Sequence, residues 1–189
     1  MFRITLIGIL CCSIVGLIVG SLLDDARAKN SDTVPLLTAK VAGTQTPKTL
    51  CERNEQVVFS CTMQKSTKLL SICTSKQIDS KNGYVQYRFG LPDKVELEFP
   101  TERKDTQSAF RYSRYTRPLV TLLTLQFESN GYKYLIHQDS NAEEKPPVNA
   151  SYLNITTPDA NAKEIEMTCR EPVKGSLMLL EDVVPRSEE

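Results

Sequence analysis

Charged and apolar residues alternate without a break in KVELEF, residues 94–99, so that one face of this segment is apolar and the other charged. Residues 84–89, YVQYRF, place apolar side chains at every second position in the same way. A period of two is typical of half-buried antiparallel strands. The residues between the two segments, Gly-Leu-Pro-Asp, have the composition of a turn. The pattern therefore predicts a β-hairpin.

A five-residue connection gives this hairpin a register in which apolar residues face apolar residues and Arg88 faces an acid. Arg88 is therefore expected to form a structural ion pair with Glu96. The predicted cross-strand pairs are Phe89–Val95, Tyr87–Leu97, Val85–Phe99 and Arg88–Glu96.

A second hairpin is predicted around Asn130-Gly131. This dipeptide is the preferred two-residue type I′ turn, because both positions need a positive φ. Centring the strands on it gives chemically sensible pairs on both faces. The predicted pairs are Phe127–Tyr134, Leu125–Ile136, Glu128–Lys133 and Thr124–His137.

A third hairpin is expected between residues 55–64 and 69–75, and it bears on the disulfides. Outside the apolar amino-terminal run the cysteines are Cys51, Cys61, Cys73 and Cys169, which allow three pairings. A register centred on Thr67 sets Cys61 opposite Cys73, close enough for a bond. This favours Cys61–Cys73 and leaves Cys51–Cys169.

Further strands are expected at 109–115, 150–156 and 163–170. The chain is therefore predicted to be all-β, a single antiparallel barrel or sandwich of about eight or nine short strands with two disulfides. The β domain is placed at 51–170. The polar stretch 29–50 is interpreted as a flexible linker, and 171–189 as a carboxy-terminal tail that forms one helical turn or lies extended.

Residues 1–28 have the organisation of an export signal. Arg3 precedes the apolar run 4–23, and Ala26-Arg27-Ala28 matches the small-x-small cleavage pattern. The run is also long enough to span a bilayer if it stays uncleaved. Both alternatives export the rest of the chain, to a periplasmic or secreted location, with membrane contact only through 4–23 in the uncleaved form.

The net charge and the motifs of the sequence argue against several classes of function. Lys plus Arg and Asp plus Glu each number 23, so the net charge is zero, which argues against a nucleic-acid binder. His137 is the only histidine and C-x-x-C is absent, so we predict no metal and no cofactor. Glu96 and Glu98 share a strand face and could flank a sugar bond as a glycosidase pair does, but the solvated face of an alternating strand is the favoured interpretation. The sequence predicts a protein that is not an enzyme.

The least ordinary segment holds three arginines and two tyrosines within seven residues and no acid. Arg and Tyr are preferred anchors of binding interfaces, and Arg also grips anions. The alternative is a charged edge strand that resists aggregation. In a flat strand Arg111 and Arg117 share a face that Arg114 opposes. The candidate binding residues are Arg111, Tyr112, Arg114, Tyr115 and Arg117, and the expected partner is an envelope protein or an anionic envelope polymer.

Four short motifs carry a resemblance: F-S-C at 59–61, S-I-C at 71–73, Y-V-Q-Y-R-F-G at 84–90 and V-E-L-E-F-P at 95–100. In these the chain resembles a set of small exported bacterial proteins of unknown function, which implies an exported β domain and no activity. In general build it is also similar to the periplasmic lysozyme inhibitors, which suggests an inhibitor of a cell-wall hydrolase as the alternative function. A glycan hydrolase is the third hypothesis.

Overall fold

The computed structural model describes residues 48–159 and 161–188. The predicted signal segment 1–28 and residues 29–47 of the predicted linker lie outside these. In the described part, no helix combines the length and apolar character needed to cross a membrane.

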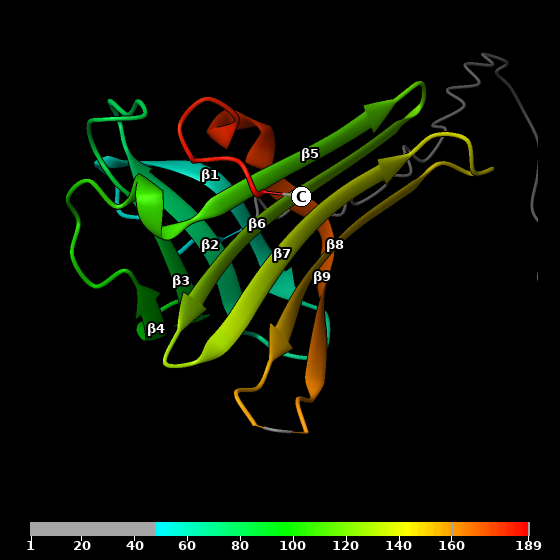
Figure 1. Cartoon of the computed structure of the whole chain (residues 1–189). Coiled ribbons are helices and arrows are strands. Elements are labelled where there is room, and N and C mark those ends of the chain that lie inside the picture. Colours follow the sequence, from blue (N-terminus) through cyan, green and yellow to red (C-terminus); the bar gives the residue numbers. More distant parts are fainter. Residues whose placement is uncertain (1–47, 160, 189) are drawn as a thin grey trace, which may run out of the picture. The chain divides into compact units, whose positions relative to one another are not determined.

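Within these described ranges, nine antiparallel strands form one curled sheet, a half-barrel, which confirms the all-β prediction with two disulfides (Figure 1). The sheet order is β4-β3-β2-β1-β9-β8-β7-β6-β5, so β4 and β5 are its edges. The strands are β1 Glu55–Met63, β2 Leu69–Ser75, β3 Val85–Leu91, β4 Lys94–Phe99, β5 Arg111–Arg117, β6 Val120–Ser129, β7 Tyr132–Asn141, β8 Val148–Thr156 and β9 Glu164–Gly175. Two short 3-10 helices, η1 Gln107–Ala109 and η2 Leu177–Leu180, complete the fold.

The concave face of the half-barrel carries the hydrophobic core. Aromatic rings from both halves of the sheet meet there: Tyr87 lies 4.9 Å from Phe127, and Phe127 stacks on Tyr134 at 4.6 Å between ring centroids. These contacts follow from the period of two, which sends every second side chain inward. The remaining side chains form the outer face of the sheet.

The β6–β7 hairpin has the predicted register at all four pairs. Asn130 and Gly131 have φ values of 51° and 80°, as a type I′ turn requires.

The β3–β4 hairpin exists, but its predicted register is wrong. Phe89 lies opposite Leu97, and Arg88 opposite Glu98 rather than Glu96. The register shifts at Gly90, whose φ is 152° and where an added Cβ would lie 2.4 Å from the Lys94 carbonyl oxygen. This irregularity leaves a two-residue turn, Pro92-Asp93, in place of the predicted five-residue connection.

The predicted disulfide pairing is also wrong: the bonds are Cys51–Cys73 and Cys61–Cys169, with Cα atoms 5.4 and 5.7 Å apart. The β1–β2 turn lies closer to β1 than predicted, so Cys61 faces Leu70 and Cys73 faces Val57. Cys61 points into the core, whereas Cys73 points to the outer face, where Cys51 reaches it. Two cysteines on opposite faces of a sheet cannot bond.

The last strand continues to Gly175, past residue 170, and the residues after it complete the core. Leu177 and Leu180 of η2 are fully buried. The chain then runs beside β5, where the Tyr112 amide donates to the Pro185 carbonyl and the Ser187 amide donates to the Tyr112 carbonyl, each at 2.9 Å. The carboxy-terminal segment is therefore part of the folded domain.

Leu180 and Leu179 test this role of η2, because Leu180 is fully buried and its neighbour is 52% exposed. Leu180→Ala is expected to lower the free energy of unfolding by about 2–4 kcal/mol, through lost burial and a cavity. Leu179→Ala should change it by less than about 0.5 kcal/mol. Denaturant unfolding of the oxidised chain measures both. Equal effects would show that η2 does not pack as described.

Candidate functional site

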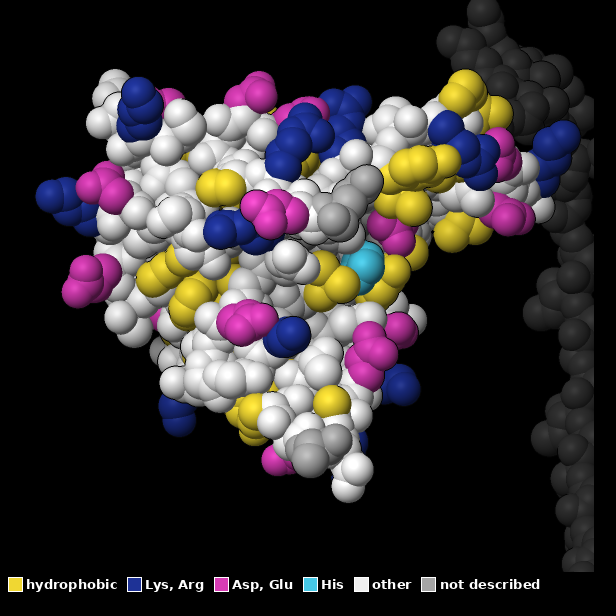
Figure 2. All heavy atoms as spheres, in the orientation of Figure 1, with side chains coloured by type: hydrophobic (Ala, Val, Ile, Leu, Met, Phe, Trp, Pro, Cys, Tyr) yellow, Lys and Arg dark blue, Asp and Glu magenta, His cyan; other side chains and the backbone are white. Residues whose placement is uncertain are grey.

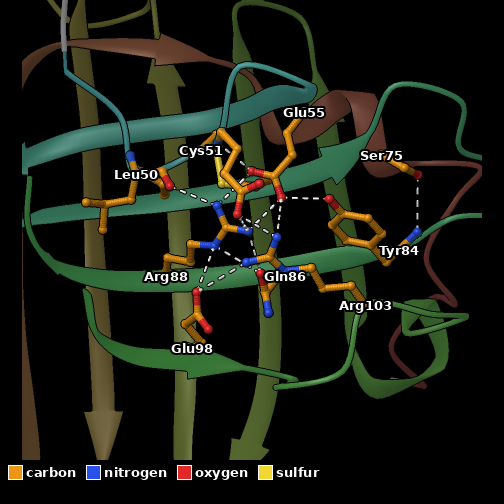
Figure 3. A network of polar contacts seen from close by, with 12 residues as sticks. Leu50, Cys51, Glu55, Ser75, Tyr84, Gln86, Arg88, Glu98 and Arg103 are labelled. Carbon is orange, nitrogen blue, oxygen red and sulfur yellow. Dashed lines mark hydrogen bonds and ion pairs between the residues drawn. A yellow bond between two sulfur atoms is a disulfide. The ribbon is translucent and has the colours of Figure 1, made fainter. Parts of the chain in front are cut away.

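A buried charged cluster lies on the outer face of β1–β3 (Figure 3). The Arg88 side chain, from β3, is 1% exposed, and that of Glu55, at the start of β1, is 0% exposed. The guanidinium donates two hydrogen bonds to the carboxylate: Nη1 to Oε2 at 2.7 Å and Nη2 to Oε1 at 2.6 Å. Paired donation of this kind is the strongest form of ion pair in proteins.

Neighbouring groups occupy the other polar atoms of the pair. Arg88 also donates to the Gln86 side chain at 2.6–2.9 Å and to the Leu50 carbonyl at 2.8 Å. Glu55 accepts from the Tyr84 hydroxyl at 2.7 Å and from the Glu52 amide at 2.6 Å. The pair is therefore saturated by the protein.

These bonds shift two pKa values. Burial alone would raise the pKa of Glu55, but hydrogen bonds from Arg88, Tyr84 and the Glu52 amide outweigh burial, and the net pKa is lowered. Burial, together with the hydrogen bond to Glu55, raises the pKa of Tyr84 to about 12. Both groups therefore keep one protonation state near neutral pH, which suits a structural role better than proton transfer.

Residues 48–54 cover this cluster and are fastened to the sheet beside it. The Cys51–Cys73 disulfide joins them to β2, and the Leu50 amide donates to the Ser71 hydroxyl at 3.0 Å. We call residues 48–55 together with Arg88 the clamp. Cys51, Glu55 and Cys73 lie close enough to hold a metal, but both sulfurs are bonded to each other and Glu55 to Arg88. The clamp is therefore a structural device.

The two glutamates considered for glycoside hydrolysis are each engaged with cations. Glu96 bonds to Lys68 at 2.6 Å rather than to Arg88, which corrects the expected ion pair. Glu98 lies 3.3 Å from Arg88 and 3.7 Å from Arg103. Neither carboxylate is held free for acid or base chemistry.

His137 lies half-buried on the outer face of β7, where its ring stacks on Tyr152 at 4.3 Å. Burial lowers its pKa. The negative charges of Asp139, Glu166 and Glu164 act to raise the pKa, but the effect of burial is larger. The Tyr152 hydroxyl donates to Asp139 at 3.2 Å, and among the described residues Nε2 of His137 has no hydrogen-bond partner. A serine or cysteine nucleophile bonded to this imidazole is absent from the described residues.

The five residues predicted as a binding strand occupy β5, an edge of the sheet, but they do not share one surface. Tyr112 is fully buried in the core. Arg111, Tyr115 and Arg117 alternate with it and lie on the outer face. Arg114 lies on the concave side with Tyr112. The strand therefore carries no continuous row of arginines.

Internal contacts also use the arginines. Arg114 bonds to Glu181 at 2.5 Å, and Arg117 bonds to Glu143. Arg111 donates to the carbonyl oxygens of Ser108 and Phe110, each at 2.8 Å. The hydrogen bond from Arg117 lowers the pKa of Glu143, and that from Arg114 lowers the pKa of Glu181, so both carboxylates stay charged. The positive charge of β5 is largely compensated within the protein.

What the structure does bring together is a patch of exposed apolar side chains where β5–β8 extend past the neighbouring strands; we call this extension, residues 114–122 and 138–150, the arm (Figure 1). Tyr115 lies directly opposite Leu122 on the outer face. The next row of cross-strand pairs toward the tip runs from Arg117 to Val148, so Val148 lies on the same face. Figure 2 shows hydrophobic side chains gathered toward that end, with charged groups among them. The patch, which we call the arm face, consists of Tyr115, Leu119, Leu122 and Val148, with exposures of 55, 64, 37 and 47%.

Leu119 stands at the tip of the arm in a left-handed conformation, with φ of 65°. A branched apolar residue rarely adopts this conformation, which glycine and asparagine favour at turns. It is also the most exposed of the large hydrophobic residues described. The unfavourable backbone conformation and the exposure make Leu119 a candidate for a functional role.

Sequence reasoning named Tyr115 and Arg117 but missed the three aliphatic members of the arm face. A signal was present: Pro118-Leu119-Val120 and Leu122-Leu123 put apolar residues on both faces of the strand and in the turn before it. An alternating pattern with one buried face does not require them.

Comparisons of the chain with protein-family models, with curated proteins and with solved structures found no match.

The clamp generates a prediction about pH. Glu55→Gln is expected to lower the free energy of unfolding at neutral pH by about 3 kcal/mol, because it leaves Arg88 buried without its carboxylate. The lowered pKa of Glu55 contributes stability above the ordinary value of 4.5, and this contribution is lost as pH falls through the folded-state pKa. The difference between the two proteins should therefore shrink in acid.

Denaturant unfolding at pH 7 and at about pH 3 measures this difference. Glu52→Gln is the control, because Glu52 is half-exposed and its pair with Arg103 should contribute less than about 1 kcal/mol. A difference between wild type and Glu55→Gln that stays constant with pH would contradict the assignment.

Leu119 generates a second prediction. Leu119→Gly should raise the free energy of unfolding, by up to about 1 kcal/mol, because glycine adopts a positive φ without strain. Thr121→Gly is the control: its position is a regular strand, so it should destabilise by about 1 kcal/mol. Thermal unfolding compares the two. Destabilisation by Leu119→Gly would show that the side chain packs within the fold.

Proposed function

We propose that this protein is an exported, non-catalytic module that binds another protein through the arm face. The observation that carries the proposal is the cluster of Tyr115, Leu119, Leu122 and Val148, all exposed and placed at one end of the sheet. Clustered apolar side chains with a polar rim are typical of protein interfaces, and isolated exposed ones are not. The Arg117–Glu143 pair supplies part of that rim.

The charge distribution favours a protein over an anionic polymer as partner. Binding a polyanion needs several cations free on one surface. On β5 the arginines lie on two faces, and two of them are bonded to carboxylates. An apolar patch flanked by balanced ion pairs is instead suited to a partner that presents apolar side chains.

The expected location of the protein outside the cytoplasm supports the same proposal. Two disulfides are consistent with an oxidising compartment, which the predicted signal segment would reach. The proposed partner is therefore an envelope or extracellular protein. A cell-wall hydrolase is one such partner, suggested only by general build, and inhibition assays with muramidases test it.

The binding test compares Leu122→Asp with Ile165→Asp. Leu122 belongs to the arm face and is 37% exposed, whereas Ile165 lies on β9 away from it and is 48% exposed. Affinity capture from an envelope extract, with the oxidised chain as bait, is expected to recover a protein whose retention falls at least about tenfold with Leu122→Asp. Ile165→Asp should retain it.

Two results would contradict the proposal. One is capture that both variants reduce equally. The other is capture that survives Leu122→Asp but weakens steeply with salt and with Arg111→Ala, since an anionic ligand would then be bound instead.

A further inference from the structure

A hollow of about 390 Å³ lies on the concave side of the arm, opposite the arm face. The sheet from β6 to β8 forms its floor. Its walls are Glu171 and Val173 of β9, Met178 of η2, and Ser176 between these two elements. Its volume is in the range of small-molecule sites in proteins.

The floor consists of two rows of side chains. They lie on the same face of the sheet as the core, but most of them are polar. Directly opposed residues share a face of the sheet, so the registers define each row. The core row is apolar, Leu125–Ile136–Leu153. The next two rows toward the end of the arm are Leu123–Gln138–Ser151 and Thr121–Ser140–Asn149.

One polar member of these rows supports a wall of the hollow. The Gln138 amide nitrogen donates to the Gly175 carbonyl at 3.2 Å, and its oxygen accepts from the Leu177 amide at 2.8 Å. These hydrogen bonds fix the start of η2 over the floor, so this wall of the hollow has a defined position.

The other polar members are left without partners. Within residues 48–159 and 161–188, no hydrogen bond joins the side chains of Thr121, Ser140, Asn149 or Ser151 to another protein group. Ser151 is only 3% exposed. Thr121 is partly exposed and Ser140 and Asn149 are exposed, so water satisfies these groups in the free protein and the hydroxyl groups of a ligand can replace that water.

The lining limits what that ligand is. None of the described residues that line the hollow is a lysine or an arginine. Glu171 is the acid on its rim, since the side chain of Asp139 lies on the outer face with Tyr152. An anionic ligand therefore has no counter-charge. Neutral hydroxyls and an amide both donate and accept, and Leu123, Val173 and Met178 offer apolar contact.

We propose that this hollow binds a small, neutral, hydroxyl-rich molecule, of the size and chemistry of one monosaccharide unit. The polar rows bond to the hydroxyl groups of the ligand, and the apolar residues contact its C–H surface. The proposal is independent of the arm face, which lies on the other side of the same strands.

The test is a titration of the full, oxidised, 15N-labelled chain with glucose, galactose and N-acetylglucosamine, and with glucose 6-phosphate as the charged comparison. At least one neutral sugar is expected to shift the amide signals of residues 121, 140, 149 and 151 saturably at millimolar concentrations. Glucose 6-phosphate should bind at least about fivefold more weakly than glucose.

Thr121→Val and Thr124→Val are a matched pair, because both threonines lie on β6 but on opposite faces. Thr121→Val should weaken the binding sugar about fivefold through loss of one hydrogen bond, and Thr124→Val should leave it unchanged. Three results would overturn the proposal: no saturable shift with any neutral sugar, shifts confined to other residues, or equal effects of the two variants. Loss of protein capture in Leu122→Asp with sugar binding intact would separate the two proposals.

Discussion

The ion pair between Arg88 and Glu55 is the constraint around which one half of the molecule is organised. A guanidinium and a carboxylate lose much hydration free energy when they are buried, and only close pairing with further hydrogen bonds offsets it. The outer face of β1–β3 therefore has to be covered, and residues 48–54 cover it, held by the Leu50 carbonyl and by the Cys51–Cys73 disulfide. The charged cluster on this face is covered by residues of the same chain.

The opposite end of the sheet has no such cover among the described residues. There the strands β5–β8 extend beyond the core, and the period of two gives each strand two chemistries. The outer rows carry the exposed apolar residues of the arm face, and the inner rows carry hydroxyl and amide groups. The proposed binding surfaces thus lie at one end of the sheet and the covered ion pair at the other, with the core between them.

Local signals in the sequence predicted local structure well. The Asn130-Gly131 turn and its flanking pattern gave the β6–β7 register residue by residue, because a type I′ turn permits only one. The β3–β4 register was wrong because Gly90 adds an irregularity that alternation does not reveal. The disulfide pairing failed for a related reason, since it assumed a turn position in the β1–β2 hairpin that the chain does not adopt.

Long-range features were beyond such reasoning. Glu55 lies 33 residues from Arg88 in sequence, and a nearer acid, Glu96, satisfied every local criterion. The binding strand was predicted from its composition, yet neighbouring strands and η2 decide which of its side chains are exposed. Tyr112 lies in the core, and Arg114 forms an ion pair within the protein. Leu119 and Leu122 are candidate binding residues only because of their position in the arm.

Residue-resolved hydrogen exchange of the oxidised chain tests this division most directly. The amides of Leu50 and Glu52 donate to groups of the sheet and the clamp, so they should exchange nearly as slowly as the core amides of β3. The amides at the tip of the arm, between Thr121 and the β5–β6 turn, should exchange faster. Rapid exchange at Leu50 and Glu52 while β3 stays protected would show that the clamp opens independently, and would contradict the account.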